Sequence, residues 1–130
     1  MMSRVLVVLC VLSMLIAVSV ASAEVTLTSP TEGQTVGPST AIAGTCSQRA
    51  FVVVITDVNL ENGELLGSVP GIRHWTNDDN SISVRISTPR LFTQPNEKLT
   101  YIIHVKAYSS AEKSTGEPDL GEAQVTCYSQ

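Results

Sequence analysis

Apolar and polar side chains alternate strictly along Leu99–Tyr108 (LTYIIHVKAY). One alternating set is Tyr101, Ile103, Val105 and Ala107, and the other is Ile102, His104, Lys106 and Tyr108. A period of two places the first set against a core and the second on a partly solvated face. Such alternation is typical of an antiparallel sheet with one wet side, so this stretch predicts the central strand of the fold.

Further strands are predicted by alternation or by short β-branched runs between turn signals. They are Glu24–Ser29, Ser39–Cys46, Phe51–Val58, Leu65–Val69, Ser81–Ser87 and Gly121–Tyr128. The run Phe51–Val58 is apolar on both faces, which is typical of a strand covered on both sides. About seven strands and no helical periodicity after residue 23 predict an all-β, two-sheet antiparallel sandwich.

Turn residues separate these strands. Asn62-Gly63 predicts a hairpin, and Pro70-Gly71 is expected to end the strand that follows it. Residues 77–80 (NDDN) and 109–120 are polar and are expected to be loops. The segment just before residue 77, which contains Arg73, His74 and Trp75, also resembles a loop.

The first 23 residues have the composition of a secretory signal peptide. A basic start at Arg4 precedes an apolar run, and Ala21-Ser22-Ala23 supplies small residues for cleavage before Glu24. The alternative is an uncleaved membrane anchor, since the run approaches the length of a spanning helix. We therefore expect a signal peptide over 1–23, a single domain over 24–130, and a secreted product, periplasmic or extracellular.

The charge balance narrows the class of partner. The chain has 8 Lys+Arg and 12 Asp+Glu, a net charge of -4, and loss of Arg4 with the leader changes this to about -5. Mild acidity argues against nucleic acid and against anionic membranes, both of which favour a basic patch. The expected partner is an extracellular protein or glycan, with a membrane role only if the leader stays uncleaved.

The mature chain resembles bacterial immunoglobulin-like or fibronectin-III-like modules of extracellular proteins. The matching segments are 29–36 (SPTEGQTV), 42–46 (IAGTC), 52–57, Trp75 and 101–105 (YIIHV), in that order. The resemblance implies an immunoglobulin-like sandwich. Members of these families serve as spacers, adhesive units or carbohydrate-contacting accessories, so it also implies binding rather than catalysis.

Cys46 and Cys127 leave three alternatives open. In an oxidising compartment two cysteines usually pair, and this bridge would close a loop of about 80 residues, worth roughly 4.5 kcal/mol. In a standard sandwich order, however, the two cysteines lie at opposite ends of their strands. About seven residues, each with a rise of about 3.3 Å, separate them, which is too far for a disulfide. Either the strand order differs, or both thiols are free, or one bridges two chains.

Nothing in the chain indicates an enzyme, a cofactor or a metal. His74 and His104 are the only side chains that titrate near neutral pH, and neither belongs to a recognised catalytic or zinc motif. His104 is expected to be an exposed residue of its strand. The acidic loop 77–80 lacks the spaced ligands of a calcium loop and is expected to be an ordinary turn.

The first functional hypothesis is a secreted, non-enzymatic binding or adhesion module. Its recognition surface would combine the outward set of the central strand with neighbouring loop residues, a mixture typical of interfaces. These candidates are Arg73, His74, Trp75, Ile102, His104, Lys106 and Tyr108. The alternatives are a carbohydrate-binding accessory domain that stacks a sugar on Trp75, if that ring is exposed rather than in the core, and a secreted protease inhibitor on the same scaffold.

Overall fold

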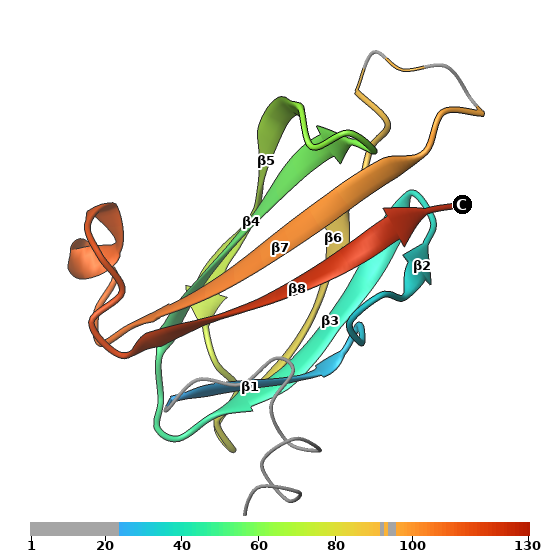
Figure 1. Cartoon of the computed structure of the whole chain (residues 1–130). Helices are drawn as coiled ribbons and strands as arrows, with labels where there is room; N and C mark the ends of the chain where they lie inside the picture. Colours follow the sequence, from blue (N-terminus) through green and yellow to red (C-terminus); the bar gives the residue numbers. More distant parts are fainter. Residues whose placement is uncertain (1–23, 92, 94–95) are drawn as a thin grey trace, which may run out of the picture.

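The computed structural model describes residues 24–130 except 92, 94 and 95, so the predicted leader lies outside the described residues (Figure 1). These residues form eight strands and one short helix. The elements are β1 (Val25–Ser29), β2 (Thr35–Val36), β3 (Ser39–Cys46), β4 (Phe51–Leu60), β5 (Leu65–Trp75), β6 (Ser81–Ser87), β7 (Leu99–Tyr108), η1 (Glu112–Thr115) and β8 (Gly121–Ser129). The prediction of an all-β chain is confirmed.

The strands form two sheets. One has the order β1-β3-β6, and the other has the order β2-β8-β7-β4-β5 (Figure 1). The expectation of a wholly antiparallel fold is wrong at one place, because β2 pairs with β8 in parallel. The reason is that the chain leaves the smaller sheet after β1 and adds two residues, Thr35 and Val36, to the free edge of the larger one.

Strand bounds follow the sequence pattern closely except in β5. The bounds of β3, β6 and β7 coincide with those expected, whereas β5 continues six residues past Val69 to Trp75. Pro70 does not end it, because β5 is the edge strand of its sheet and one side of its backbone needs no partner. Gly71 sits at an irregularity in the β4–β5 register, where an added Cβ would lie 2.9 Å from the carbonyl oxygen of Val54.

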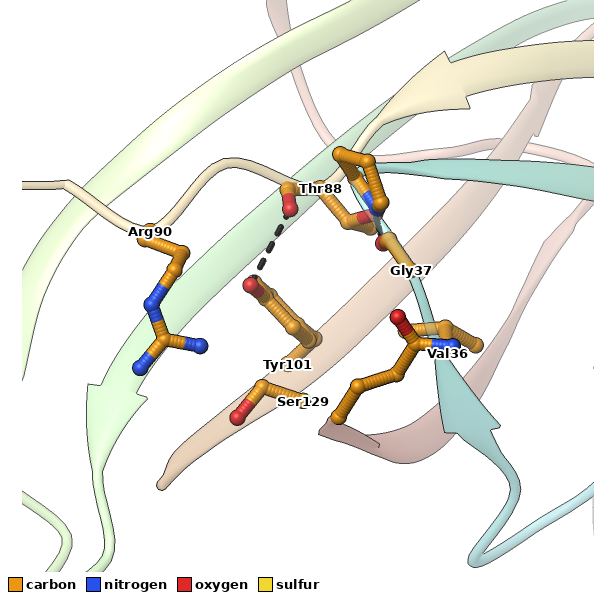
Figure 2. Close-up of a pocket in the computed structure, with 8 residues that line it drawn as sticks. Val36, Gly37, Thr88, Arg90, Tyr101 and Ser129 are labelled. Atoms are coloured by element: carbon orange, nitrogen blue, oxygen red, sulfur yellow. Dashed lines mark hydrogen bonds between the residues drawn. The ribbon is translucent and has the colours of Figure 1, made fainter. Parts of the chain in front are cut away.

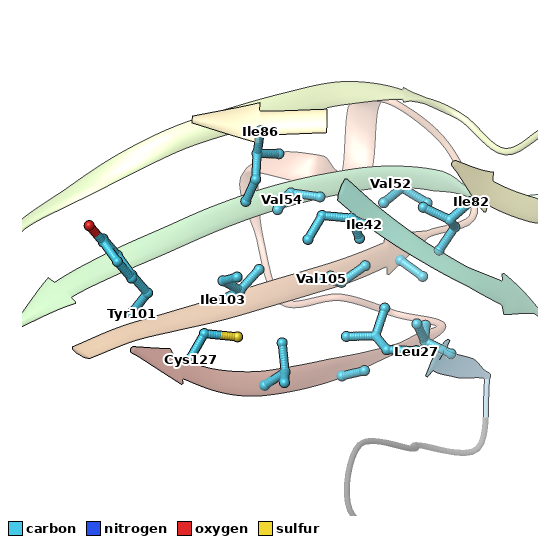
Figure 3. Close-up of a cluster of buried hydrophobic side chains, with 14 of the residues drawn as sticks. Leu27, Ile42, Val52, Val54, Ile82, Ile86, Tyr101, Ile103, Val105 and Cys127 are labelled. Atoms are coloured by element: carbon cyan, nitrogen blue, oxygen red, sulfur yellow. The ribbon is translucent and has the colours of Figure 1, made fainter. Parts of the chain in front are cut away.

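The main core lies between the two sheets. Ile103 and Val105 are fully buried, which confirms the inward set of the central strand. Facing residues from both sheets meet there, as Figure 3 shows. From the three-stranded sheet come Leu27, Ile42, Ile82 and Ile86, and from the five-stranded sheet come Val52, Val54, Tyr101, Ile103, Val105 and Cys127.

Cys46 and Cys127 are both buried, free thiols. In the strand register Cys46 lies opposite Val25, at the start of β1. Cys127 instead follows Thr126, whose carbonyl accepts a hydrogen bond from Gly33 in the turn after β1. The two therefore lie at opposite ends of the sandwich, as the topological argument expects. Burial raises the pKa of both thiols, that of Cys127 to about 11.

Candidate functional site

The five-stranded sheet has a second face, turned away from the core, which we call the outer face. Directly paired residues project to the same side of a sheet, so the strand register defines its members. They include Phe51, Val53, Ile55, Asp57, Ser68, Arg73, Trp75, Ile102, His104, Lys106, Tyr108, Glu122, Gln124 and Thr126. Six of the seven candidate binding residues lie on this face, and only His74 does not.

The expectation that Arg73, His74 and Trp75 belong to a loop is wrong. All three lie in the last part of β5, where Arg73 pairs with Val53 and Trp75 with Phe51. Alternation sends the exposed side chain of His74 to the opposite side of the strand, and its Nδ1 lies 2.7 Å from its neighbour's carbonyl oxygen. His74 is thus separated from the other candidates.

One end of the outer face has a small apolar cluster of its own. Phe51, Val53 and Tyr108 are buried there, and the Phe51 and Trp75 rings meet edge to face with centroids 5.7 Å apart. Tyr108 was expected on a partly solvated surface, yet it is only 2% exposed. The β7–β8 connection packs over it, and the tyrosine hydroxyl donates a 3.0 Å hydrogen bond to the carbonyl of Gly116.

Two guanidinium groups stack on this cluster. Arg49, in the connection before β4, lies 4.9 Å from the centre of the Trp75 ring, and Arg73 lies 5.5 Å from that of Phe51. Arg73 also donates a 2.6 Å hydrogen bond to Ser114 in the β7–β8 connection. Cation–π contacts of this kind hold a charged group close to the face of a ring.

Beside that cluster, His104 bridges two carboxylates. Its Nε2 lies 3.0 Å from Asp57 on one neighbouring strand, and its Nδ1 lies 3.0 Å from Glu122 on the other. Ser68 donates a further hydrogen bond of 2.6 Å to Asp57. His104 is therefore half-buried and fully engaged, rather than the simple exposed histidine that the sequence suggests.

This trio does not have the geometry of a metal centre. The two ring nitrogens of His104 point in different directions, so Asp57 and Glu122 lie on opposite sides of the ring rather than around one point. Within the described ranges, no group of three or more His, Cys, Asp or Glu side chains is placed to hold a metal ion. The trio links β4, β7 and β8 across the sheet.

The acidic loop 77–80 forms a turn. Asp79 accepts hydrogen bonds of 3.0 and 2.6 Å from the backbone and hydroxyl of Ser81, and these bonds lower the pKa of its carboxyl group. Asn77 bonds to the same serine through its side chain. The side chains of the loop thus hydrogen-bond within the turn that connects β5 and β6.

Among the open cavities formed by the described residues, two lie beside tyrosines at the end of the sandwich away from Trp75. One, of about 170 Å³, lies beside Tyr101, whose hydroxyl donates a 3.0 Å hydrogen bond to the carbonyl of Thr88 (Figure 2). The same hydroxyl lies 3.0 Å from the carbonyl oxygen of Pro89. The other, of about 490 Å³, is lined by residues that include Lys98 and Tyr128. None of the binding candidates from the sequence lines either one.

Sequence reasoning missed four residues that build the outer face. Arg49 and Phe51 join Trp75 and Arg73, and Asp57 and Glu122 join His104. The outward alternation of β4 could have pointed to Phe51 and Asp57. Arg49 lies outside any strand, and only the register of β4 against β5 brings it to the tryptophan.

Comparison with protein-family models finds no match to this chain, and comparison with curated proteins finds none either. In the part of the chain that the structure describes, no helix is long and apolar enough to cross a membrane.

Proposed function

We propose that the protein is a secreted, non-enzymatic binding module that recognises another protein through the outer face of its five-stranded sheet. The observation that carries this proposal is that Arg73 and Trp75 of β5 lie on the same face as the outward set of β7. Half-buried apolar side chains such as Ile102 lie there beside arginines and aromatic rings. Arginines and aromatic residues are enriched at protein interfaces.

We also propose that the scaffold is immunoglobulin-like. The strand order supports this, since the first, third and sixth strands share one sheet and the remaining strands share the other. The hydrogen bonds from Tyr101 to the carbonyls of Thr88 and Pro89 support it as well, because a tyrosine near the start of the penultimate strand anchors the preceding loop in such domains.

Export of the chain is part of the same proposal. It rests on the leader-like residues 1–23, and it requires cleavage between Ala23 and Glu24. Intact-mass analysis of protein collected outside the producing cells should give a chain that begins at Glu24. Retention of the whole product in the cell with an intact leader would contradict export.

Photo-crosslinking tests the recognition surface directly. Ile102 is replaced with p-benzoylphenylalanine, a photo-crosslinking residue, and the protein is illuminated in the extracellular medium of its source. The matched control places the same residue at Ser83, which is exposed on β6 of the other sheet. We expect a discrete crosslinked adduct from position 102 alone. Adducts of equal yield from both positions, or from position 83 alone, would overturn the proposal.

A further inference from the structure

Three cations on one side of this acidic protein have no carboxylate partner. Arg49, Arg73 and Lys106 make no ion pair with any described residue, although the whole sequence has more acidic than basic side chains. Val53 lies between Arg73 and Lys106 in the strand register, so their backbones are about 10 Å apart. We call Arg49, Phe51, Arg73, Trp75 and Lys106 the cationic corner.

The acidic side chains beside the corner already have hydrogen-bond or ion-pair partners. Glu122 pairs across the strands with Lys106, yet its carboxylate bonds to His104, as does Asp57. Asp119, in the β7–β8 connection, accepts hydrogen bonds from Ser109 and lies 3.4 Å from Lys113. These carboxylates thus have hydrogen-bond partners of their own, and none of them forms an ion pair with the three cations.

The guanidinium groups are also held in position before any ligand arrives. Stacking on Trp75 and Phe51 restricts Arg49 and Arg73, and the bond to Ser114 restricts Arg73 further. A guanidinium held over a ring has several N–H donors, and two of them can bind a carboxylate through parallel hydrogen bonds. Such preorganisation reduces the entropy that binding must offset.

We propose that the cationic corner binds a carboxylate-rich segment of a protein partner, an inference that rests on the function proposed above and names the chemistry of that partner. A protein fits better than a polysaccharide, because a sugar needs an exposed flat ring. Phe51 and Tyr108 are buried, and the half-buried Trp75 has a guanidinium over its ring. The available groups are N–H donors, which match carboxylates.

The sole tryptophan of the chain lies in this corner, so its fluorescence reports on binding there. The full protein is titrated with a capped octaglutamate peptide while Trp75 emission and the anisotropy of a labelled peptide are followed. We expect a saturable change in both signals. Arg49→Gln and Arg73→Gln should each weaken binding about tenfold, since each removes a charge-assisted contact.

Arg85→Gln is the matched control, because Arg85 is exposed on β6 of the other sheet and its loss changes the net charge equally. It should leave the affinity within about twofold. Unchanged Trp75 emission, equal effects of all three variants, or binding of oligogalacturonate in place of octaglutamate would overturn the inference. A positive crosslink at position 102 with no octaglutamate binding would contradict only the partner's charge, whereas failure of both would contradict the proposed function too.

Discussion

The outer faces of the two sheets obey the same alternation and have very different compositions. The face of the three-stranded sheet carries mainly short side chains, namely Thr26, Thr28, Ala41, Ala43, Thr45, Ser83, Arg85 and Ser87. The outer face of the five-stranded sheet carries tryptophan, arginines, a bridged histidine and isoleucines. Short polar side chains are enough to keep a sheet face solvated, so the larger ones serve another purpose, and we propose that this purpose includes recognition.

Part of that purpose is structural, because one end of the larger outer face is a second small core. Phe51, Val53 and Tyr108 form a cluster separate from the main core, with Ile55 and Trp75 packed against it and the β7–β8 connection bonded to Tyr108. The cationic corner thus rests on a packed base, whereas the exposed residues of β3 and β6 have none. The difference between the two faces can be sharpened by substitutions on each.

The largest expected effect is at that base. Phe51→Ala should lower the free energy of unfolding by about 3 kcal/mol, because it removes a buried ring and leaves a cavity. Arg85→Ala on the other face should change it by less than about 0.5 kcal/mol. Urea unfolding followed by circular dichroism measures both. Equal, small changes would mean that the outer face has no core of its own.

The stability of the protein should depend on pH through Cys127, on the inner side of β8. Burial raises the pKa of Cys127 from about 9 to about 11, so the folded state favours the neutral thiol. The stabilisation is present below pH 9 and is lost as the pH rises toward 11, at a total of about 3 kcal/mol. Urea unfolding at pH 7 to 11 should show this loss in the natural protein. Cys127→Val should show a shallower decline, and an identical decline would exclude the thiol as its source.

Replacing two buried threonines, one in each sheet, with valine should change the free energy of unfolding in opposite directions. The hydroxyl of Thr56 in β4 has no hydrogen-bond partner among the described residues, whereas that of Thr40 in β3 lies 3.0 Å from that of Thr88. Thr56→Val should therefore raise the free energy of unfolding by about 1 kcal/mol, and Thr40→Val should lower it by about as much. Thermal unfolding of the two variants decides this, and a loss of stability in both would contradict the assignment.

The smallest expected effect concerns the histidine bridge. His104→Gln should cost about 0.5 kcal/mol at low salt and less at high salt, because the contacts to Asp57 and Glu122 are partly exposed. A double-mutant cycle with Asp57→Asn isolates the coupling. The same His104→Gln variant should weaken octaglutamate binding, since it releases two carboxylates beside Lys106. Unchanged stability and binding would show that the bridge has no part in either.

Strand positions were largely predictable from local pattern, and pairing was not. The alternation of β7 and the bounds of β3 and β6 follow directly from side-chain periodicity. The path of β5 past Pro70 depends on its place at the sheet edge, which is set by distant pairing. The parallel strand β2 has two residues, too few for any periodicity to appear.

The candidate site was predictable as a set of residues rather than as an arrangement. Outward alternation identified Ile102, His104 and Lys106 because one strand holds all three. The contacts of Arg49 with Trp75 and of His104 with Asp57 join segments 26 and 47 positions apart, and a register irregularity near Gly71 sets part of the alignment. No local pattern contains that information.

Amide NMR of the isotopically labelled protein, with and without the partner captured by the position-102 crosslink, tests the central claim most directly. Binding should shift or broaden the backbone signals of Arg73, Ile102 and Lys106 on the outer face of the five-stranded sheet. The signals of Ala41 and Ser83 on the other sheet should stay in place. Perturbations confined to Ala41, Ser83 and their neighbours would contradict the account.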